Sequence, residues 1–175
     1  MLTKYNNNES IKRTGIILYT YNPRQPKNIQ FLMGIDQNSR DLCDFGGGRK
    51  TNEHVLESAL RELSEETRGI FGSEITTETI RTSSILTNKI NEIIFFVYID
   101  PKWIDIAEHK FMEAKNNGID TELCYNELSG LVWIDAEEFY RLFNSKGNRR
   151  IWSKLGKFIK YNTTRDQLEG LSIVI

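Results

Sequence analysis

Apolar and polar positions alternate along the chain in short runs that have the periods of strands and helices. Segments rich in β-branched and aromatic residues predict strands. A continuous apolar run near residue 95 is typical of a central strand that is buried on both faces. The segment before it alternates only weakly, and we interpret it as one or two strands. The predicted strands are 11–21, 29–35, 42–45, 75–87, 91–100 and 130–135.

The remaining periodic segments predict helices. Residues 52–67 place apolar side chains at the i, i+3, i+4 and i+7 positions of an amphipathic helix. Pro101 suits the first turn of a second helix, and Asp135 is a candidate N-cap for a helix over 136–143. A last helix is predicted over 149–161. This order of elements predicts an α/β/α sandwich, in which a mixed β-sheet carries helices on both faces.

Two prolines and two asparagines in residues 21–28 predict a loop between the first two strands. Two strands joined in this way are expected to form a hairpin. The sequence therefore predicts that the first two strands are neighbours in the sheet.

Composition restricts the class of protein. The chain has 175 residues, of which 39% are hydrophobic and 27% are charged, and this suits a single soluble domain over 1–175. The net charge of −1 favours neither nucleic acid nor a membrane as a partner. The longest apolar run, 93–99, is too short to span a bilayer. Cys43 and Cys124 lack metal-type spacing, and two free thiols are favoured over a disulfide. We therefore expect a cytoplasmic protein.

Three glutamates cluster on the first predicted helix. At about 100° per residue, Glu62, Glu65 and Glu66 fall on the flank of the apolar stripe that contains Leu56 and Leu63. Like charges at this spacing repel one another, and burial beside the stripe increases the cost. A hard divalent cation such as Mg²⁺ or Mn²⁺, which prefers oxygen ligands, removes the repulsion. The alternative interpretation is a solvated, glutamate-rich surface.

Three consecutive glycines, 46–48, precede this helix. Glycine lets the backbone approach a ligand closely and adopt positive φ. A loop without side chains beside a metal site suits a substrate that carries phosphate. The glycines therefore favour the cation site over the solvated surface.

The same segment resembles the Nudix box, G-x5-E-x7-R-E-U-x-E-E-x-G-U, in which U is an aliphatic or bulky apolar residue. Seven fixed positions agree in register, from Gly47 through Glu53 to the run that begins at Arg61 and ends at Glu66. The box covers about 23 of the 175 residues. The resemblance implies a Nudix-type α/β/α sandwich and an enzyme that hydrolyses pyrophosphate bonds with divalent metal ions.

The match to the box departs from the pattern at its end. Arg68 occupies the position of the box glycine, and Gly69 follows one residue later. We expect the helix to run one residue further before its glycine stop, or the turn to be distorted. The carboxylates precede this irregularity, so we expect the metal-binding face to be intact. Asn52 replaces a glycine that is common before the first glutamate, and asparagine tolerates the left-handed region.

The resemblance assigns metal-binding roles residue by residue. Glu62, Glu65 and Glu66 would bind the metal, and Glu65 and Glu66 would be the principal catalytic glutamates of the box. Gly47 or Gly46 would add a backbone carbonyl as a further ligand.

The resemblance also implies a supporting ion pair and a base. Arg61 would neutralise and orient Glu53 and its neighbours. Some Nudix enzymes use a box glutamate as the base, and others use a glutamate on a loop outside the box. The loop before the last predicted strand offers Glu122 and Glu127. Glu127 is favoured as a catalytic residue because its spacing to Trp133 resembles that of many members. The alternative is an ordinary exposed loop glutamate.

Signals for the substrate and for partners are weaker. A nucleobase commonly stacks on an aromatic ring, although each candidate ring also suits the core. The long connection 101–129 is a candidate insertion that shapes substrate choice or a dimer contact. Dimers are common in the family, so a homodimer is an alternative to a monomer. The basic segment 149–161 either packs on the sheet or grips RNA. The aromatic candidates are Tyr19, Tyr21, Phe31 and Trp133.

Three functional hypotheses follow. The leading one is Mg²⁺- or Mn²⁺-dependent hydrolysis of the pyrophosphate bond in a nucleoside diphosphate linked to another moiety, such as a nucleotide sugar or a dinucleotide. The second is hydrolysis of the messenger RNA cap or of diphosphoinositol polyphosphates, which would need a wide basic groove. The third is a catalytically silent nucleotide sensor, and the complete set of box glutamates argues against it.

Overall fold

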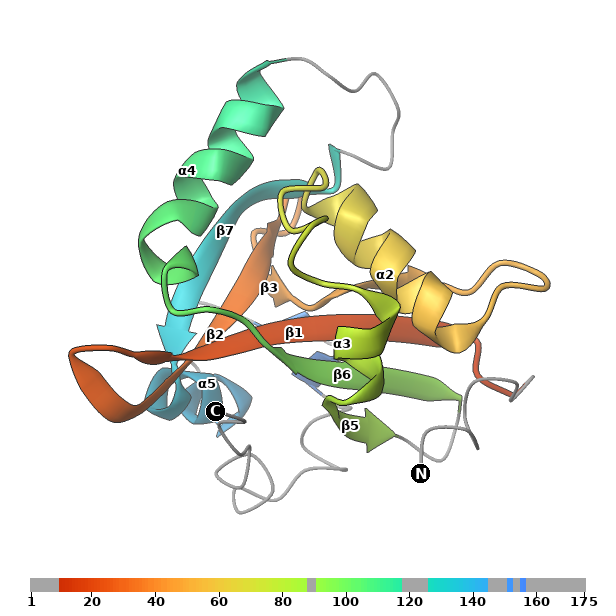
Figure 1. The fold of residues 1–175 in the computed structure, drawn as a ribbon, viewed down its shortest axis with the longest axis horizontal. Helices are drawn as coiled ribbons and strands as arrows, with labels where there is room; N and C mark the ends of the chain where they lie inside the picture. The colour runs from red at the N-terminus through yellow and green to blue at the C-terminus, as the bar shows by residue number, and fades with distance from the viewer. Residues whose placement is uncertain (1–9, 88–90, 118–125, 145–150, 153–154, 157–175) are drawn as a thin grey trace.

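A computed structural model describes residues 10–87, 91–117, 126–144, 151–152 and 155–156. Within these ranges the strands form one mixed sheet, and helices cover both of its faces (Figure 1). The predicted α/β/α sandwich is confirmed. No helix in the described part of the chain is both long enough and apolar enough to span a bilayer.

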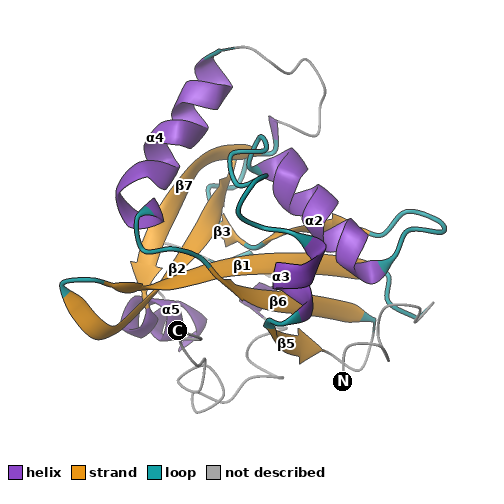
Figure 2. Cartoon of the chain, viewed as in Figure 1, coloured by secondary structure: helices purple, strands orange, loops and turns teal. Residues whose placement is uncertain are grey.

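The elements follow the predicted order with few exceptions (Figure 2). The strands are β1 (Arg13–Asn22), β2 (Gln25–Asp36), β3 (Leu42–Cys43), β4 (Phe45–Gly48), β5 (Ser84–Thr87), β6 (Glu92–Tyr98) and β7 (Leu128–Asp135). The helices are α2 (Val55–Glu66), α3 (Thr77–Arg81), α4 (Trp103–Asn116) and α5 (Ala136–Asn144). The predicted cap of the last of these is present, because Asp135 Oδ1 accepts a hydrogen bond of 2.7 Å from the amide of Glu138.

The sheet is built around β1. Its strand order is β3-β2-β1-β6-β5, and β4 also pairs with β1 while β7 pairs with β2. Strands β1 and β6 are parallel, and the other pairs described are antiparallel. The β1–β2 hairpin is confirmed. The central position of β6 explains its continuous apolar run, because both faces of this strand are buried.

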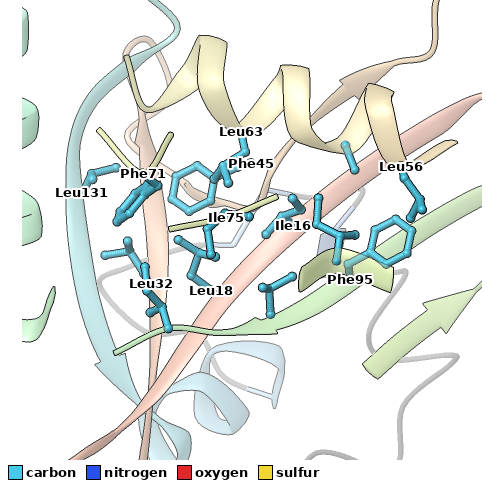
Figure 3. Close-up of a cluster of buried hydrophobic side chains, with 14 of the residues drawn as sticks. Ile16, Leu18, Leu32, Phe45, Leu56, Leu63, Phe71, Ile75, Phe95 and Leu131 are labelled. Atoms are coloured by element: carbon cyan, nitrogen blue, oxygen red, sulfur yellow. The ribbon is translucent and has the colours of Figure 1, made fainter. Parts of the chain in front are cut away.

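Alternate side chains of the strands enter two cores. In β1, Ile16 and Leu18 belong to the core beneath α2, α3 and α4, whereas Ile17 belongs to the opposite core. Figure 3 shows the first core, with Leu56 and Leu63 of α2 above the sheet. In the second core, Phe139 of α5 stacks on a phenylalanine of β2, and the ring centroids are 4.4 Å apart.

The loop predicted over 21–28 is wrong in its extent. Strands β1 and β2 continue into it until Asn22 pairs with Gln25, and only residues 23–24 form the turn. Asn22 Oδ1 accepts a hydrogen bond of 2.9 Å from the amide of Arg24. This local bond closes a tight turn, so the proline-rich composition does not require a long loop.

The strand prediction over 75–87 is also wrong in its first half, which forms the short helix α3 before β5. Thr76 Oγ1 accepts a hydrogen bond from the amide of Thr79 at 3.3 Å, and Thr79 Oγ1 accepts one from the amide of Thr76 at 3.3 Å. This reciprocal capping box outweighs the weak alternation of the segment.

Only part of the helix predicted over 149–161 is described. The prediction is wrong at 151–152, because Ile151 forms a parallel bridge with Leu42 of the edge strand β3 and the amide of Trp152 donates to Leu42 O at 2.8 Å. Residues 155–156 are helical. Leu155 is buried in the second core. These contacts agree with packing on the sheet, and RNA binding stays a prediction. Glu122 and Cys124 lie outside the described residues.

Candidate active site

The three glycines form strand β4 against β1 rather than the predicted loop. None of them has positive φ, so their function here is close approach of the backbone. A Cβ atom on Gly47 would lie within 2.7 Å of all three carboxylate atoms of Glu62, whereas one on Gly48 would meet nothing within 4 Å. A Cβ on Gly46 would overlap the backbone of β1. Strand β4 can therefore pack directly against the glutamates of α2.

The helix that carries the glutamates begins later than predicted. It starts at Val55 rather than at residue 52, because Asn52 has a φ of 65° and lies in a turn. The left-handed conformation of this asparagine was predicted. The turn leads from β4 into α2 and places Glu53 below the helix, where it meets Arg61.

Two of the box glutamates face the protein interior. The exposed fraction is 9% for Glu62 and 6% for Glu66. Glu66 Oε2 accepts a hydrogen bond of 3.0 Å from the amide of Gly46. Glu65 is more exposed, at 22% for its side chain. Glu62 and Glu66 therefore do not belong to a solvated surface.

Burial of these glutamates disfavours their ionised form, because it removes the carboxylates from water. Desolvation raises the pKa of Glu66 well above its usual value, and the carboxylates of Asp44 and Glu127 raise it further. Desolvation also raises the pKa of Glu62, against the opposing effect of Arg61, and Glu127 contributes to this increase too. The charge of Glu127, the loop glutamate outside the box, thus opposes ionisation of both box glutamates.

Arg61 contacts three of the carboxylates around α2, and Lys50 Nζ lies 3.7 Å from Glu65 Oε1. Its Nε lies 2.7 Å from Glu53 Oε1, and its Nη1 lies 2.7 Å from Glu62 Oε1 and 2.9 Å from Glu65 Oε2. Its Nη2 donates to Gly48 O at 3.1 Å. The hydrogen bond from Arg61 is the main cause that lowers the pKa of Glu53. Arg61 thus contacts its expected partner and two box glutamates, and it joins α2 to β4.

A second ion pair lies beneath β4, and the sequence interpretation missed it. Arg13 donates from Nη1 and Nη2 to the two carboxylate oxygens of Asp44, both at 2.9 Å. Arg13 Nη2 also donates to Gly46 O at 3.1 Å, and its guanidinium lies 5.2 Å from the ring centre of Trp152. The pair therefore fixes the carbonyl of Gly46, and the amide of the same residue binds Glu66. The sequence signal was one charged residue at the start of β1 and another between β3 and β4.

The donor set fits a hard divalent cation. Buried carboxylates with raised pKa values are oxygen ligands whose charge such an ion would stabilise. Within the described ranges, however, no three acidic, histidine or cysteine side chains are already arranged as a metal-binding group. Arg61 contacts Glu62 and Glu65, and the amide of Gly46 binds Glu66. A bound Mg²⁺ or Mn²⁺ would replace some of these contacts.

Helix α2 ends at Glu66, so the predicted longer helix end is wrong. Arg68 and Gly69 have φ values of 58° and 69°. The amide of Gly69 donates to Ser64 O at 2.8 Å, and the amide of Arg68 donates to Glu65 O at 3.4 Å. This is the hydrogen-bond pattern of a Schellman motif. Arg68 itself therefore adopts the left-handed conformation for which glycine is usual.

The aromatic candidates for substrate stacking have mainly structural positions. Tyr19 and Phe31 are buried in the second core. Trp133 donates from Nε1 to Trp103 O at 3.2 Å and packs against the first core. Tyr21 is partly exposed and stacks on a tyrosine of β6. Three of the four therefore contribute to the fold.

The box residues thus follow one path through the structure. Strand β4 of the mixed sheet leads through the Asn52 turn into the glutamate helix α2, which ends in a tight turn. The described elements agree with the α/β/α sandwich that the resemblance to the box implies.

Three of the solved structures that have a likeness to this chain are the following. A MutT/Nudix family protein from Enterococcus faecalis is 16% identical with a TM-score of 0.44, and the match covers 74% of this chain but only 45% of that protein. An Ap4A hydrolase from C. elegans is 15% identical with a TM-score of 0.47, covering 86% of this chain and 93% of that one. A pyrophosphohydrolase from Bacillus subtilis is 17% identical with a TM-score of 0.47, covering 95% and 87%.

No family model matches the chain, and no curated protein matches it. At these identities and TM-scores, the activities of the three solved proteins do not carry over to this chain. Its function has to be argued from its own residues.

Proposed function

We propose that the protein is a divalent-metal-dependent pyrophosphohydrolase of the Nudix type. Its substrate in this proposal is a nucleoside diphosphate linked to another moiety, such as a nucleotide sugar or a dinucleotide. The main support is the placement of buried Glu62 and Glu66 against the three glycines of β4, where Glu62 lies at Gly47 and Glu66 binds the amide of Gly46. Carboxylates of this kind suit a cation, and the bare strand leaves room for phosphate oxygens.

The metal ligands in this proposal are Glu62, Glu65 and Glu66, with a backbone carbonyl of Gly46 or Gly47. When bound, Mg²⁺ or Mn²⁺ neutralises phosphate oxygens and lowers the pKa of the attacking water. The rest of the protein then has to hold these glutamates in fixed positions, because phosphoryl transfer depends mostly on positioning and charge stabilisation.

The remaining residues have supporting parts in the proposal. Glu127 accepts the proton of the attacking water as general base. Arg61 keeps Glu53 and the first turn of α2 against β4 through its contacts with Glu53 and Gly48. Arg13 and Asp44 hold the peptide of Gly46 from below.

The test is a substrate panel in Mg²⁺ or Mn²⁺. The panel should include nucleotide sugars, NADH, ADP-ribose, dinucleoside polyphosphates, nucleoside triphosphates, capped RNA and diphosphoinositols. We expect phosphate-containing products from at least one linked nucleoside diphosphate, and no product in EDTA. Glu65→Gln should lower kcat by about a hundredfold or more, because a metal ligand loses its charge.

A matched control is Glu108→Gln, which removes an exposed carboxylate of α4 far from the glycine strand in sequence. This variant should keep the wild-type rate. Full activity of Glu65→Gln would show that the metal assignment is wrong, and hydrolysis that continues in EDTA would rule out the metal-dependent mechanism.

A further inference from the structure

Arg68 adopts a strained backbone conformation while its side chain makes contacts that glycine cannot make. A left-handed residue with a Cβ atom is unfavourable relative to glycine. Arg68 Nη2 nevertheless donates to Asn126 Oδ1 at 3.1 Å, in the segment that precedes β7. Its guanidinium also lies 6.0 Å from the ring centre of Phe111 on α4. The side chain therefore joins the end of α2 to two other segments.

The segment that carries Glu127 is held at further points. The amide of Gln37, in the turn after β2, donates to Glu127 O at 2.8 Å. Lys115 of α4 donates from Nζ to Leu128 O at 3.1 Å. Together with the contact of Arg68 to Asn126, these bonds connect the three successive residues 126–128 to three separate parts of the chain.

These restraints act against an electrostatic force. Glu127 is exposed, and Arg68, which lies two residues after Glu66, binds Asn126, the residue directly before Glu127. Like charges repel, so an unrestrained loop glutamate would move away from the box glutamates. Contacts with the neighbours of Glu127 oppose that movement and keep its carboxylate near the box.

We propose that Arg68 is a positioning residue, which holds Asn126 and thereby keeps Glu127 beside the glutamates of α2. This inference rests on the proposed function, because it gives Glu127 a part in the reaction. It also explains an arginine at the box glycine position: the strained backbone is retained because the side chain orders a segment of the site.

The test replaces Arg68 by the glycine that the box pattern prefers. Arg68→Gly keeps the left-handed turn and removes backbone strain, so the variant should fold with a Tm within about 3 °C of wild type. Its kcat should fall about tenfold while KM changes less than twofold, because a group needed only in the reaction step is misplaced. Arg68→Lys retains a donor for Asn126 and should recover part of that loss.

The matched control is Arg40→Gly, since Arg40 is an exposed arginine with a φ of 63°. It should leave kcat unchanged. A second experiment is independent of activity: hydrogen exchange of the peptide that contains residues 126–129, measured without substrate. Arg68→Gly and Asn126→Ala should each speed exchange in this peptide alone, and the double variant should be no faster than either single one.

Several outcomes would overturn the inference. They are wild-type exchange in Arg68→Gly, faster exchange throughout the chain, an equal loss of kcat in Arg40→Gly, or additive effects of the two single variants. If the wild-type protein hydrolyses no substrate of the panel, the proposed function fails, while the exchange experiment still decides whether Arg68 orders the segment of Glu127.

Discussion

At the scale of single residues, two neighbouring glycines of strand β4 have different surroundings. Gly47 lies against the carboxylate of Glu62, and Gly48, the next residue of β4, faces open space. The sequence pattern treats both as members of a flexible loop, but the structure places them in a strand with ordinary backbone angles. What matters at Gly47 is therefore the absence of a Cβ atom.

This difference predicts unequal effects of the same substitution. Gly47→Ala should displace the Glu62 carboxylate and lower kcat by about tenfold or more, because the group cannot keep its position beside an added methyl. Gly48→Ala should leave activity within about twofold of wild type, since nothing lies in the way. Steady-state kinetics of both variants provide the measurement, and equal losses would contradict the assignment.

Local rules predicted some residues of the site and failed at others for identifiable reasons. The left-handed Asn52 could be predicted because asparagine is tolerated there. The flank position of Glu62 and Glu66 followed from helical periodicity. The conformation of Arg68 could not be predicted, because its compensation comes from Asn126, a residue far away in sequence. The Arg13–Asp44 pair was missed for the same reason.

At the scale of elements, the Arg13–Asp44 pair fastens β4 to β1 beneath the glutamates. The Asp44 side chain is completely buried, and no solvent reaches it to replace the arginine. An unpaired carboxylate at this place would be strongly unfavourable. The pair therefore contributes to stability and to the position of the Gly46 peptide at once.

Replacing the arginine should show this cost directly. Arg13→Met keeps most of the apolar stem but leaves Asp44 buried without its partner, so the free energy of unfolding should fall by about 3–5 kcal/mol. Arg81→Met is the control, because Arg81 pairs with Glu78 on the surface, where the side chains are 55% and 70% exposed. The control should lose at most about 0.5 kcal/mol. Urea unfolding measures both, and similar losses would contradict the prediction.

Element prediction was most reliable where local pattern and tertiary context agree. The continuous apolar run of β6 and the amphipathic period of α2 each have one explanation. The weak alternation before β5 is compatible with a strand or a helix, and a capping box that involves only Thr76 and Thr79 favours helix α3. The parallel pairing of β1 with β6 leaves no local signal, because it joins segments that are distant in sequence.

At the scale of the whole molecule, the buried Glu66 makes stability depend on pH. Its folded-state pKa is raised above the usual unfolded value of about 4.3. The folded protein therefore binds the proton of the Glu66 carboxyl group more tightly than the unfolded chain does. This tighter binding stabilises the fold fully below the unfolded-state pKa, and the stabilisation is lost as pH rises through the folded-state pKa. A divalent cation that binds only the folded state would restore stability.

The comparison of wild type with Glu66→Gln isolates this effect. In EDTA, the Tm of the variant relative to wild type should increase as pH rises from 4 upwards, because glutamine does not ionise. Adding Mn²⁺ at high pH should raise the Tm of wild type and leave that of Glu66→Gln nearly unchanged. Differential scanning fluorimetry measures both, and a Tm difference independent of pH would contradict the assignment.

The central place of β1 has a consequence for synthesis on the ribosome. This strand emerges early, but two of its neighbours in the sheet, β4 and β6, are made later, and β7, which completes the sheet beyond β2, is made later still. Until then the nascent chain exposes an apolar strand edge and depends on protection from aggregation. The glutamate helix is made before the segment of Glu127, so the two parts of the proposed site can meet only after that segment has been synthesised.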